Sequence, residues 1–247
     1  MIQHTKHVDV DGDHYKCVLS LGIRCFTEIY LRNLNFKMFS SPFDGLYLST
    51  TNDIIKLLEN HITDHHLEHT EDLEEFKSCN ETWGFRTLHN GLDNILLKNN
   101  NNTENRYHLA TFAHHNLKKT DVRNHFNKAF QRFDIIQKNR IRTLFCLFIH
   151  PNYYNYVNIS MDSIDILSNY LLSKYNFHLL VIYFAKMSNQ EQQSPMINKI
   201  KETNNYTIYN INNDSIEFIE HQHTLHSIFK TFGIEENKLL KYEDFQN

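Results

Sequence analysis

The sequence predicts an α/β fold: an open, mostly parallel sheet of about five strands with helices on both faces. Several short apolar runs lack polar alternation, which is typical of strands buried on both faces. Between these runs lie segments with apolar residues at three- and four-residue spacing, as expected for helices that connect parallel strands. Only 6 Gly and 3 Pro accompany 30 Asn. This composition favours a helix-containing fold over a barrel or sandwich with glycine and proline corners.

The N-terminal part begins with a short apolar run at 16–21, which we interpret as a buried strand. Gly22 follows, and the apolar spacing from Phe26 to Leu34 predicts a helix. The next segment, SSPFDG at 40–45, has Pro, Asp and Gly at turn positions. Polar residues at 49–52 then offer an N-cap to a second helix. That helix carries the apolar residues Ile54, Ile55, Leu57 and Leu58.

Residues 61–105 are charged and rich in His and Asn, so we expect a helical or irregular insertion there. No linker rich in Pro, Gly and Ser divides the chain. The simplest organisation is one α/β domain over 1–247 that contains this insertion. A division near residue 100 is the alternative.

From residue 107 the predicted strands and helices alternate to the end of the chain. Apolar runs predict strands at 107–113, 144–149, 177–184 and 206–211. Helical spacing predicts helices at about 122–138, 160–175, 196–202 and 215–232. The first of these helices is amphipathic, with basic residues on its solvated side. This order is typical of βαβ units.

The net charge and the cysteines restrict the expected binding partners and cellular compartment of the protein. The chain has 25 Lys and Arg against 29 Asp and Glu, which argues against binding to nucleic acid or anionic lipid. No apolar run reaches the roughly 18 to 20 residues that span a bilayer. Four cysteines without a CxxC pair fit a reducing compartment. We therefore expect a cytoplasmic protein, or one of the host cytoplasm or virion if the source is viral. Its small-molecule or peptide substrate and its oligomeric state stay open.

The sequence predicts neither a cofactor nor a metal. GxGxxG and GxxxxGK[ST] are absent, so nucleotide cofactors have no motif support. Two histidine groups have spacings that a metal site can use. They are His61, His65 and His69, and His221, His223 and His226. We interpret the first group as a solvated helix face. The second lacks a carboxylate or thiol at a fixed spacing.

Ligands of open parallel sheets bind beyond the carboxyl ends of the strands, and this rule selects candidate residues. The predicted strand ends lead into Cys25, His114 and His115, His150, and Lys186. Cys25 is the candidate nucleophile because the first turn of a helix favours thiolate, and Arg24 adds to that effect. The alternative is that Cys25 is a small buried residue that packs the helix. Cys17 and Cys146 lie inside apolar strands and are expected in the core, and Cys79 has no visible partner.

His114 and His115 are candidates for the general base. Neighbouring residues at a strand end point in opposite directions, so at most one of them faces the crevice. The alternative is a pair of exposed loop histidines. Asp44 is a candidate for orienting the imidazole through its other nitrogen. Its alternative role is to hydrogen-bond the backbone of its own turn.

The stretch from Val18 to Tyr47 resembles the opening motif of a family of microbial and viral domains named "putative papain-like cysteine peptidases". That motif has Ser-Leu-Gly, two variable residues and Cys, followed by an apolar helix and a Ser-x-Pro-Phe-Asp turn. It is matched by Ser20, Leu21, Gly22, Cys25, Ser40, Pro42, Phe43 and Asp44. The downstream segments YHLATFAHH and FNKAFQRFDIIQKNR also resemble the family pattern. The resemblance implies a thiol nucleophile at Cys25, a histidine at His114 or His115, and a role for Asp44.

These observations predict a thiol-dependent hydrolase or acyl transferase, similar to a cysteine peptidase, with a Cys nucleophile and a His base. The alternative prediction is a non-catalytic or glycan-related domain. Such a domain would bind an anionic small molecule, such as a nucleotide-sugar, in the crevice at the strand edge.

Overall fold

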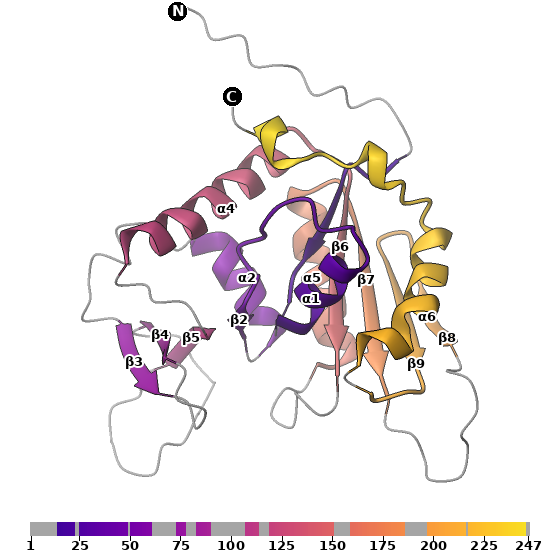
Figure 1. The fold of residues 1–247 in the computed structure, drawn as a ribbon, viewed down its shortest axis with the longest axis horizontal. Coiled ribbons are helices and arrows are strands. Elements are labelled where there is room, and N and C mark those ends of the chain that lie inside the picture. The colour runs from indigo at the N-terminus through magenta and orange to yellow at the C-terminus, as the bar shows by residue number, and fades with distance from the viewer. Residues whose placement is uncertain are drawn as a thin grey trace, which may run out of the picture.

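The computed structural model describes residues 14–22, 25–48, 50–60, 73–77, 83–89, 107–113, 119–150, 159–185, 197–215 and 217–245. Within these ranges, the strands at 73–77, 83–89 and 107–113 are described by their backbone alone. Figure 1 shows the chain as a sheet with helices on both faces and a second, smaller sheet beside it.

The main sheet confirms the predicted α/β fold. Its five strands run in the order β1-β6-β7-β9-β8, and the first four are parallel. Their bounds are β1 Cys17–Ser20, β6 Thr143–Ile149, β7 Phe177–Phe184, β9 Tyr206–Ile211 and β8 Ile197–Glu202. The central strands are buried on both faces, which explains their continuous apolar sequences.

In the described part of the chain, five α-helices cover the two faces of this sheet. They are α1 Cys25–Asn33, α2 Thr51–Asn60, α4 Thr120–Lys138, α5 Met161–Lys174 and α6 Phe218–Thr231. Two 3₁₀ helices, η3 Glu236–Lys238 and η4 Tyr242–Phe245, follow them. One core cluster joins α2, α4 and α5 to the sheet, and the other joins α1 and α6 to its opposite face. Neighbouring residues of β6, such as Phe145 and Cys146, belong to opposite clusters because strand side chains alternate.

Two helix ends follow the local chemistry of the sequence. Before α2, the Thr50 hydroxyl accepts the Asp53 N–H at 3.2 Å while the Asp53 carboxylate accepts the Thr50 N–H at 2.9 Å. This reciprocal pair resembles a capping box. After α1, Asn35 adopts φ 60°, and the Phe36 N–H bonds back to the Leu31 carbonyl. An asparagine thus occupies a left-handed position that glycine often takes.

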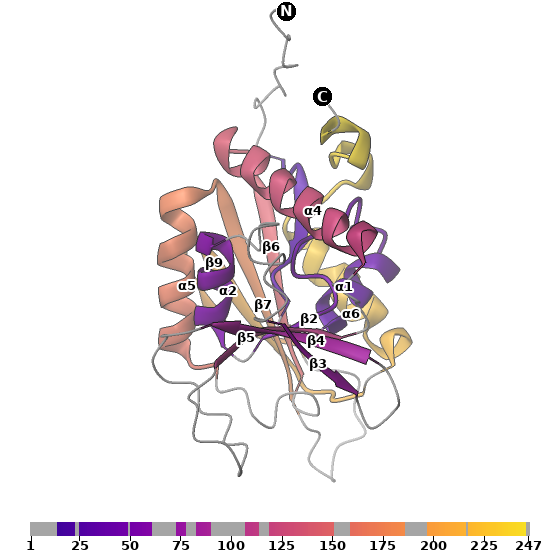
Figure 2. The same cartoon turned by 90° about the vertical axis from the view of Figure 1, so that its left-hand side faces the viewer.

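A second sheet of four antiparallel strands has the order β2-β5-β4-β3. Its strands are β2 Leu46–Tyr47, β5 Tyr107–Ala113, β4 Trp83–His89 and β3 Leu73–Lys77. Figure 2 shows it across the end of the molecule where the parallel strands finish. The strand at 107–113 is confirmed, but its placement in the parallel sheet is wrong. The insertion at 61–105 was expected to be helical or irregular, but it contains the strands β3 and β4, which pair with each other. β4 also pairs with β5, which lies beyond the insertion.

The helix predicted at 196–202 is also wrong, because Ile197–Glu202 forms strand β8, antiparallel to β9. A register shift between Lys199 and Lys201 interrupts the pairing. Such a bulge alters the two-residue alternation of the strand, so the Ile197–Ile200 spacing resembles that of a helix. Thr203 closes the connecting turn, since its hydroxyl accepts the N–H of Tyr206 at 3.0 Å.

Within the described parts of the chain, no helix is both long and apolar enough to cross a membrane.

Candidate active site

Ser41 anchors the loop after α1 to the end of β1. Its hydroxyl donates a 2.8 Å hydrogen bond to the carbonyl oxygen of Ser20. The hydroxyl of Ser20 accepts the N–H of Gly22 at 3.0 Å. Both serines are buried, so these bonds are shielded from competing water. The SSPFDG turn is therefore held against the strand that leads to Cys25.

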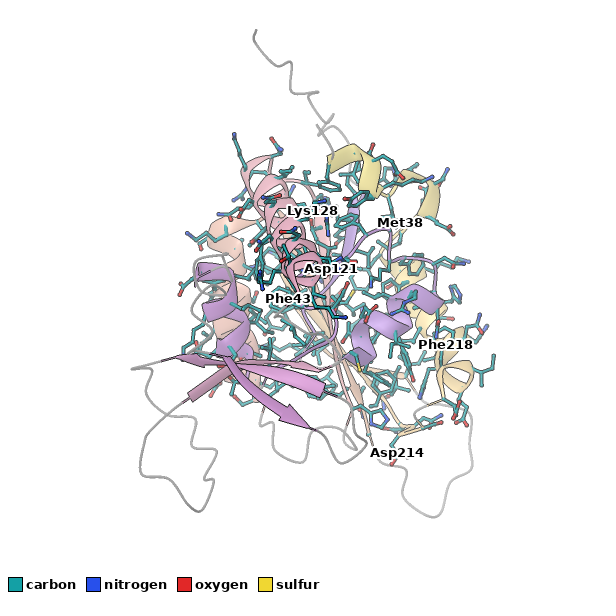
Figure 3. All side chains as sticks on the ribbon, turned by 60° about the vertical axis from the view of Figure 1, so that its left-hand side comes forward. Met38, Phe43, Asp121, Lys128, Asp214 and Phe218 are labelled. Carbon is teal, nitrogen blue, oxygen red and sulfur yellow. The ribbon has the colours of Figure 1, made fainter. Side chains whose placement is uncertain are left out.

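The turn is closed by Asp44, whose Oδ2 accepts the Ser41 N–H at 2.8 Å. Asp44 thus has the structural role that the sequence left open as an alternative. Gly45 follows at φ 71°, a conformation that suits glycine. The Phe43 side chain is fully buried and contacts Phe133 of α4, with ring centroids 5.8 Å apart. Figure 3 shows Phe43 beside this helix.

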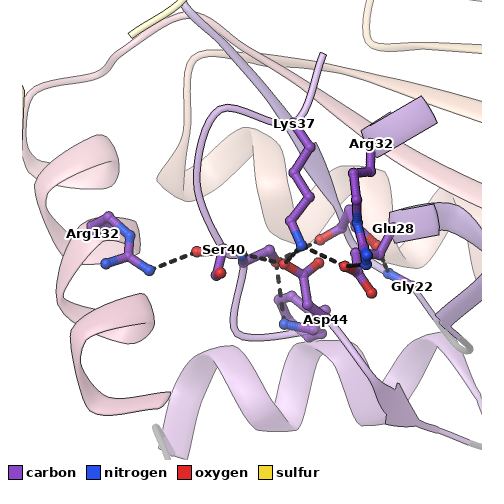
Figure 4. Close-up of polar contacts among 10 residues, drawn as sticks. Gly22, Glu28, Arg32, Lys37, Ser40, Asp44 and Arg132 are labelled. Atoms are coloured by element: carbon purple, nitrogen blue, oxygen red, sulfur yellow. Dashed lines mark hydrogen bonds and ion pairs between the residues drawn. The ribbon is translucent and has the colours of Figure 1, made fainter. Parts of the chain in front are cut away.

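A charge cluster connects the turn to α1 (Figure 4). The ammonium of Lys37 lies 2.9 Å from Asp44 Oδ2 and 2.5 Å from Glu28 Oε1. Arg32 also pairs with Glu28. The carboxylate side chains of Glu28 and Asp44 are each only 10% exposed. One lysine therefore links the helix that begins at Cys25 with the turn that contains Asp44.

The two carboxylates of this cluster have opposite pKa shifts. Burial raises the pKa of Asp44 to about 6, although Lys37 opposes the rise. Burial also disfavours the ionised form of Glu28, but Lys37 and Arg32 outweigh it and lower the pKa of that carboxyl. Asp44 is therefore a carboxylate whose protonation changes close to physiological pH.

The second oxygen of Asp44 has no hydrogen-bond partner among the described residues. This Oδ1 atom is buried, whereas Oδ2 receives both the Ser41 N–H and the Lys37 ammonium. Buried carboxylate oxygens are normally hydrogen-bonded, so we expect a donor that binds Asp44 Oδ1. A ring N–H of a histidine is one group of suitable chemistry.

Cys25 is the first residue of α1 and is partly exposed. Glu28 lies one turn further along, and residues three apart are neighbours on a helix surface. Cys25 is therefore a neighbour, on the surface of α1, of the carboxylate that pairs with Lys37. By contrast, Cys17 and Cys146 are buried in the core, as predicted, and burial raises the pKa of both thiols. Arg24 and Cys79 lie outside the described residues.

The strand that leads to the predicted general base reaches the same turn. Phe112 of β5 pairs with Leu46 of β2, and β5 ends one residue later at Ala113. The end of β5 therefore lies where β2 leaves the Asp44 turn. His114 and His115 follow next in the sequence and lie outside the described residues. The assignment of either one as base stays a prediction. The strand that precedes them, β5, was expected in the parallel sheet but pairs with β2 in the second sheet.

His150 and Lys186 were also predicted at the crevice beyond the strand ends. His150 is fully buried, and its Nε2 lies 3.2 Å from the Ser215 carbonyl oxygen. His221 contacts the same carbonyl oxygen at 2.7 Å, and burial lowers its pKa. Both rings pack against Phe184. These two histidines are thus core groups on the α1 and α6 face. Lys186 lies outside the described residues.

The predicted histidine spacings are tested only in part. His61, His65 and His69 lie outside the described residues. Over the described ranges, no group of three or more His, Cys, Asp or Glu side chains is arranged to hold a metal ion.

Two residues of α4 near the turn were given no functional role from the sequence. One of them, Arg132, was predicted on the solvated basic side of this helix, and that prediction is wrong because its side chain is buried. Arg132 is buried and donates to the Ser40 carbonyl oxygen at 2.8 Å. Its guanidinium also lies over the rings of Phe39 and Tyr242. His125 occurs seven residues earlier, which is close to two helical turns. Burial lowers the pKa of His125, and the charges of Arg132 and Lys37 lower it further.

A cavity of about 720 Å³ lies between α4 and the C-terminal residues Tyr242 and Phe245. Lys128 and Arg132 contribute basic groups to its lining. The lining comes from the second half of α4, which leads into the amino end of β6. This cavity is therefore separate from the predicted crevice at the carboxyl ends of the strands.

The fold and the site define an α/β protein with a partly exposed thiol at a helix start and a buried carboxylate in an adjoining turn. Residues 16–187 match the model of a family described as "Putative papain-like cysteine peptidase". This match covers more than half of the chain, so the protein belongs to that family. No curated protein and no solved structure matches the chain.

Proposed function

We propose that the protein is a thiol-dependent hydrolase or acyl transferase with Cys25 as its nucleophile. His114 or His115 takes the thiol proton as Cys25 Sγ attacks a carbonyl carbon. The histidine then protonates the leaving group, and a thioester to Cys25 remains. Water or a second nucleophile attacks this thioester, passing a proton to the histidine. The acyl group leaves, and the proton returns to the Cys25 sulfur.

The vacant Oδ1 of Asp44 is the observation that carries this proposal. In a triad, a third group receives a hydrogen bond from the nitrogen of the imidazole that does not face the nucleophile. Asp44 has one oxygen engaged by the Ser41 N–H and Lys37, and it has the other available for such a bond. The carboxylate is therefore both fixed in position and incompletely satisfied.

The chain path supports the same assignment. The Asp44 turn lies against the end of β1 through Ser41 and against the end of β5 through the Leu46–Phe112 pair. Cys25 follows the first of these strand ends, and the candidate histidines follow the second. Ala113, the last residue of β5, directly precedes His114 in the sequence.

The start of α1 suits the chemistry proposed for Cys25. The first N–H groups of a helix have no partner within the helix, and the helix dipole favours negative charge there. These N–H groups are candidates for stabilising both the thiolate and the oxyanion that forms from the substrate carbonyl. Family membership points to the same class of chemistry. Papain itself has an α+β architecture, so the name supports an analogy of functional residues rather than a shared fold.

The alternative of an anionic ligand at the strand edge has less support. Arg32 and Lys37, two basic residues near this edge, are already paired with Glu28 and Asp44. An anion would have to compete with these two buried carboxylates. No observation among the described residues favours that competition.

The test is the pH dependence of the rate at which iodoacetamide alkylates Cys25, measured by mass spectrometry of the peptide that contains it. We expect the rate to rise with a midpoint well below the value of about 8.5 of an ordinary thiol. His114→Ala or His115→Ala, whichever removes the base, should move the midpoint upward and slow the reaction at pH 7.

His125→Ala is the matched control because His125 is another histidine near the cluster. It should leave the alkylation profile unchanged if the base follows β5. A wild-type midpoint near 8.5 that none of the three variants moves would refute the thiol chemistry. A shift in His125→Ala alone would reassign the base to α4.

A further inference from the structure

We propose that Lys37 is a positioning residue that holds Asp44 by one oxygen and leaves the other available as a hydrogen-bond acceptor, and that Glu28 sets the strength of this hold. The effect on Cys25 rests on the function proposed above. The effect on Asp44 does not depend on it.

The geometry shows how the carboxylate is held. Two donors, the Lys37 ammonium and the Ser41 N–H, approach the same oxygen of Asp44, at 2.9 and 2.8 Å. Two contacts on Oδ2 restrict rotation of the carboxylate, so Oδ1 keeps one orientation. The side chain of Lys37 is only 17% exposed, which limits screening of its charge by water.

Glu28 competes with Asp44 for the same ammonium. Its Oε1 lies 2.5 Å from the Lys37 Nζ and also receives Arg32. Lys37 favours the ionised form of Asp44, whereas the negative charge of Glu28 disfavours it. Arg132 on α4 is a further charged group that interacts with Asp44. The protonation of Asp44 therefore reflects a balance between burial, one shared cation and one nearby anion.

This balance predicts opposite effects for two substitutions in the same cluster. Lys37→Met removes the cation and should raise the pKa of Asp44 above about 6, by about 1 to 3 pH units. Glu28→Gln removes the anion and leaves Lys37 to Asp44 alone, so it should lower that pKa. A general loss of structure would not move the titration in two directions.

The experiment is a carboxyl ¹³C NMR titration of Asp44 in the full-length protein and its variants. Arg32→Met is the matched control, since Arg32 pairs with Glu28 without contacting Asp44, and it should leave the Asp44 titration nearly unchanged. Lys37→Arg keeps the positive charge and should restore a titration near that of the wild type. An unchanged Asp44 titration in both Lys37→Met and Glu28→Gln would overturn the proposal. If Lys37→Met does not fold, the downward shift in Glu28→Gln decides the matter.

The alkylation of Cys25 separates this proposal from the proposed function. If Asp44 orients the base, Lys37→Met should slow the reaction at pH 7 in proportion to the ionised fraction of Asp44. From a pKa of about 6, a rise of one pH unit lowers that fraction about twofold and a rise of two lowers it about tenfold. Lys37→Arg should recover the rate. Asp44 titrations that move as expected beside identical alkylation rates would support the hold of Lys37 on Asp44 and refute the proposed role of Asp44 in orienting the base.

Discussion

The hydroxyl of Ser41 donates a 2.8 Å hydrogen bond to the carbonyl oxygen of Ser20, which lies 21 residues earlier in the chain. This bond joins the end of β1 to the turn that contains Asp44. Ser20 precedes the loop to Cys25, and Ser41 lies three residues before Asp44. A buried bond of a single serine thus fixes the relative position of the segments that carry the two groups.

Replacing Ser41 by Ala should destabilise the protein. The change leaves the buried Ser20 carbonyl without this donor and also removes the acceptor for the Phe43 N–H. We expect a loss of roughly 1–3 kcal/mol in the free energy of unfolding, measured by urea denaturation. Ser173→Ala is the control, because Ser173 is exposed on α5 and its hydroxyl donates to the Tyr170 carbonyl oxygen of the same helix. Equal losses in the two variants would contradict the anchoring role of Ser41.

Asp44→Asn should change how stability depends on pH. The pKa of Asp44 in the folded protein is about 6, above the 3.8 of an unperturbed carboxyl. The stabilising contribution is therefore complete below about pH 4 and is lost as the pH rises through 6, amounting to about 3 kcal/mol. The Asn variant lacks this loss, so its unfolding free energy should fall less between pH 4 and 7.

The measurement is urea unfolding at several pH values in that window. Asp162→Asn on exposed α5 surface should keep the slope of the wild type. If Asp44→Asn and the wild type have the same slope, Asp44 is not a buried carboxylate with a raised pKa.

His221→Gln should protect the protein against mild acid. Burial holds the pKa of His221 below its usual 6.5, so its stabilising contribution is present above 6.5 and is lost as the pH falls toward the lower value. The loss reaches at most about 1.4 kcal/mol per pH unit. A glutamine amide can still donate to the Ser215 carbonyl but takes up no proton.

Unfolding free energies at pH 7.5 and 5.5 test this expectation. The difference between the two pH values should be smaller in His221→Gln than in the wild type. His223→Gln, on the exposed side of α6, should leave the difference unchanged. If the difference in unfolding free energy between the two pH values is smaller only in His223→Gln, the acid sensitivity belongs to the exposed His223 and not to His221.

Local patterns in the sequence predicted much of the fold. Continuous apolar runs identified β1, β6, β7 and β9, because strands covered on both faces have no polar side. Helical spacing identified α1 and α4. Errors arose where an element depends on a distant partner or has an irregular register. The paired residues of β5 and β2 lie about 65 positions apart. β8 is an edge strand with a bulge that alters its apolar spacing.

The candidate site likewise contains residues that the sequence predicted and residues that it missed. The sequence predicted a cysteine at the start of a helix and an aspartate in a turn, because both features depend on neighbouring residues. It missed Glu28, Lys37 and Arg132, although their charges within otherwise apolar segments were a possible signal. Their partners are separated by up to 92 residues, and the sequence alone does not show which charges become buried together.

By itself, the sequence determined the strands and helices outside residues 61–105 and 196–202, the SSPFDG turn and the position of Cys25 at a helix start, since periodicity and turn chemistry act over a few residues. Only the tertiary structure decided that β5 meets the Asp44 turn and that Lys37 is shared by two carboxylates. It also decided that one oxygen of Asp44 is left open. Strand pairing and burial create these relationships, because they bring distant segments together and remove water from the charges between them.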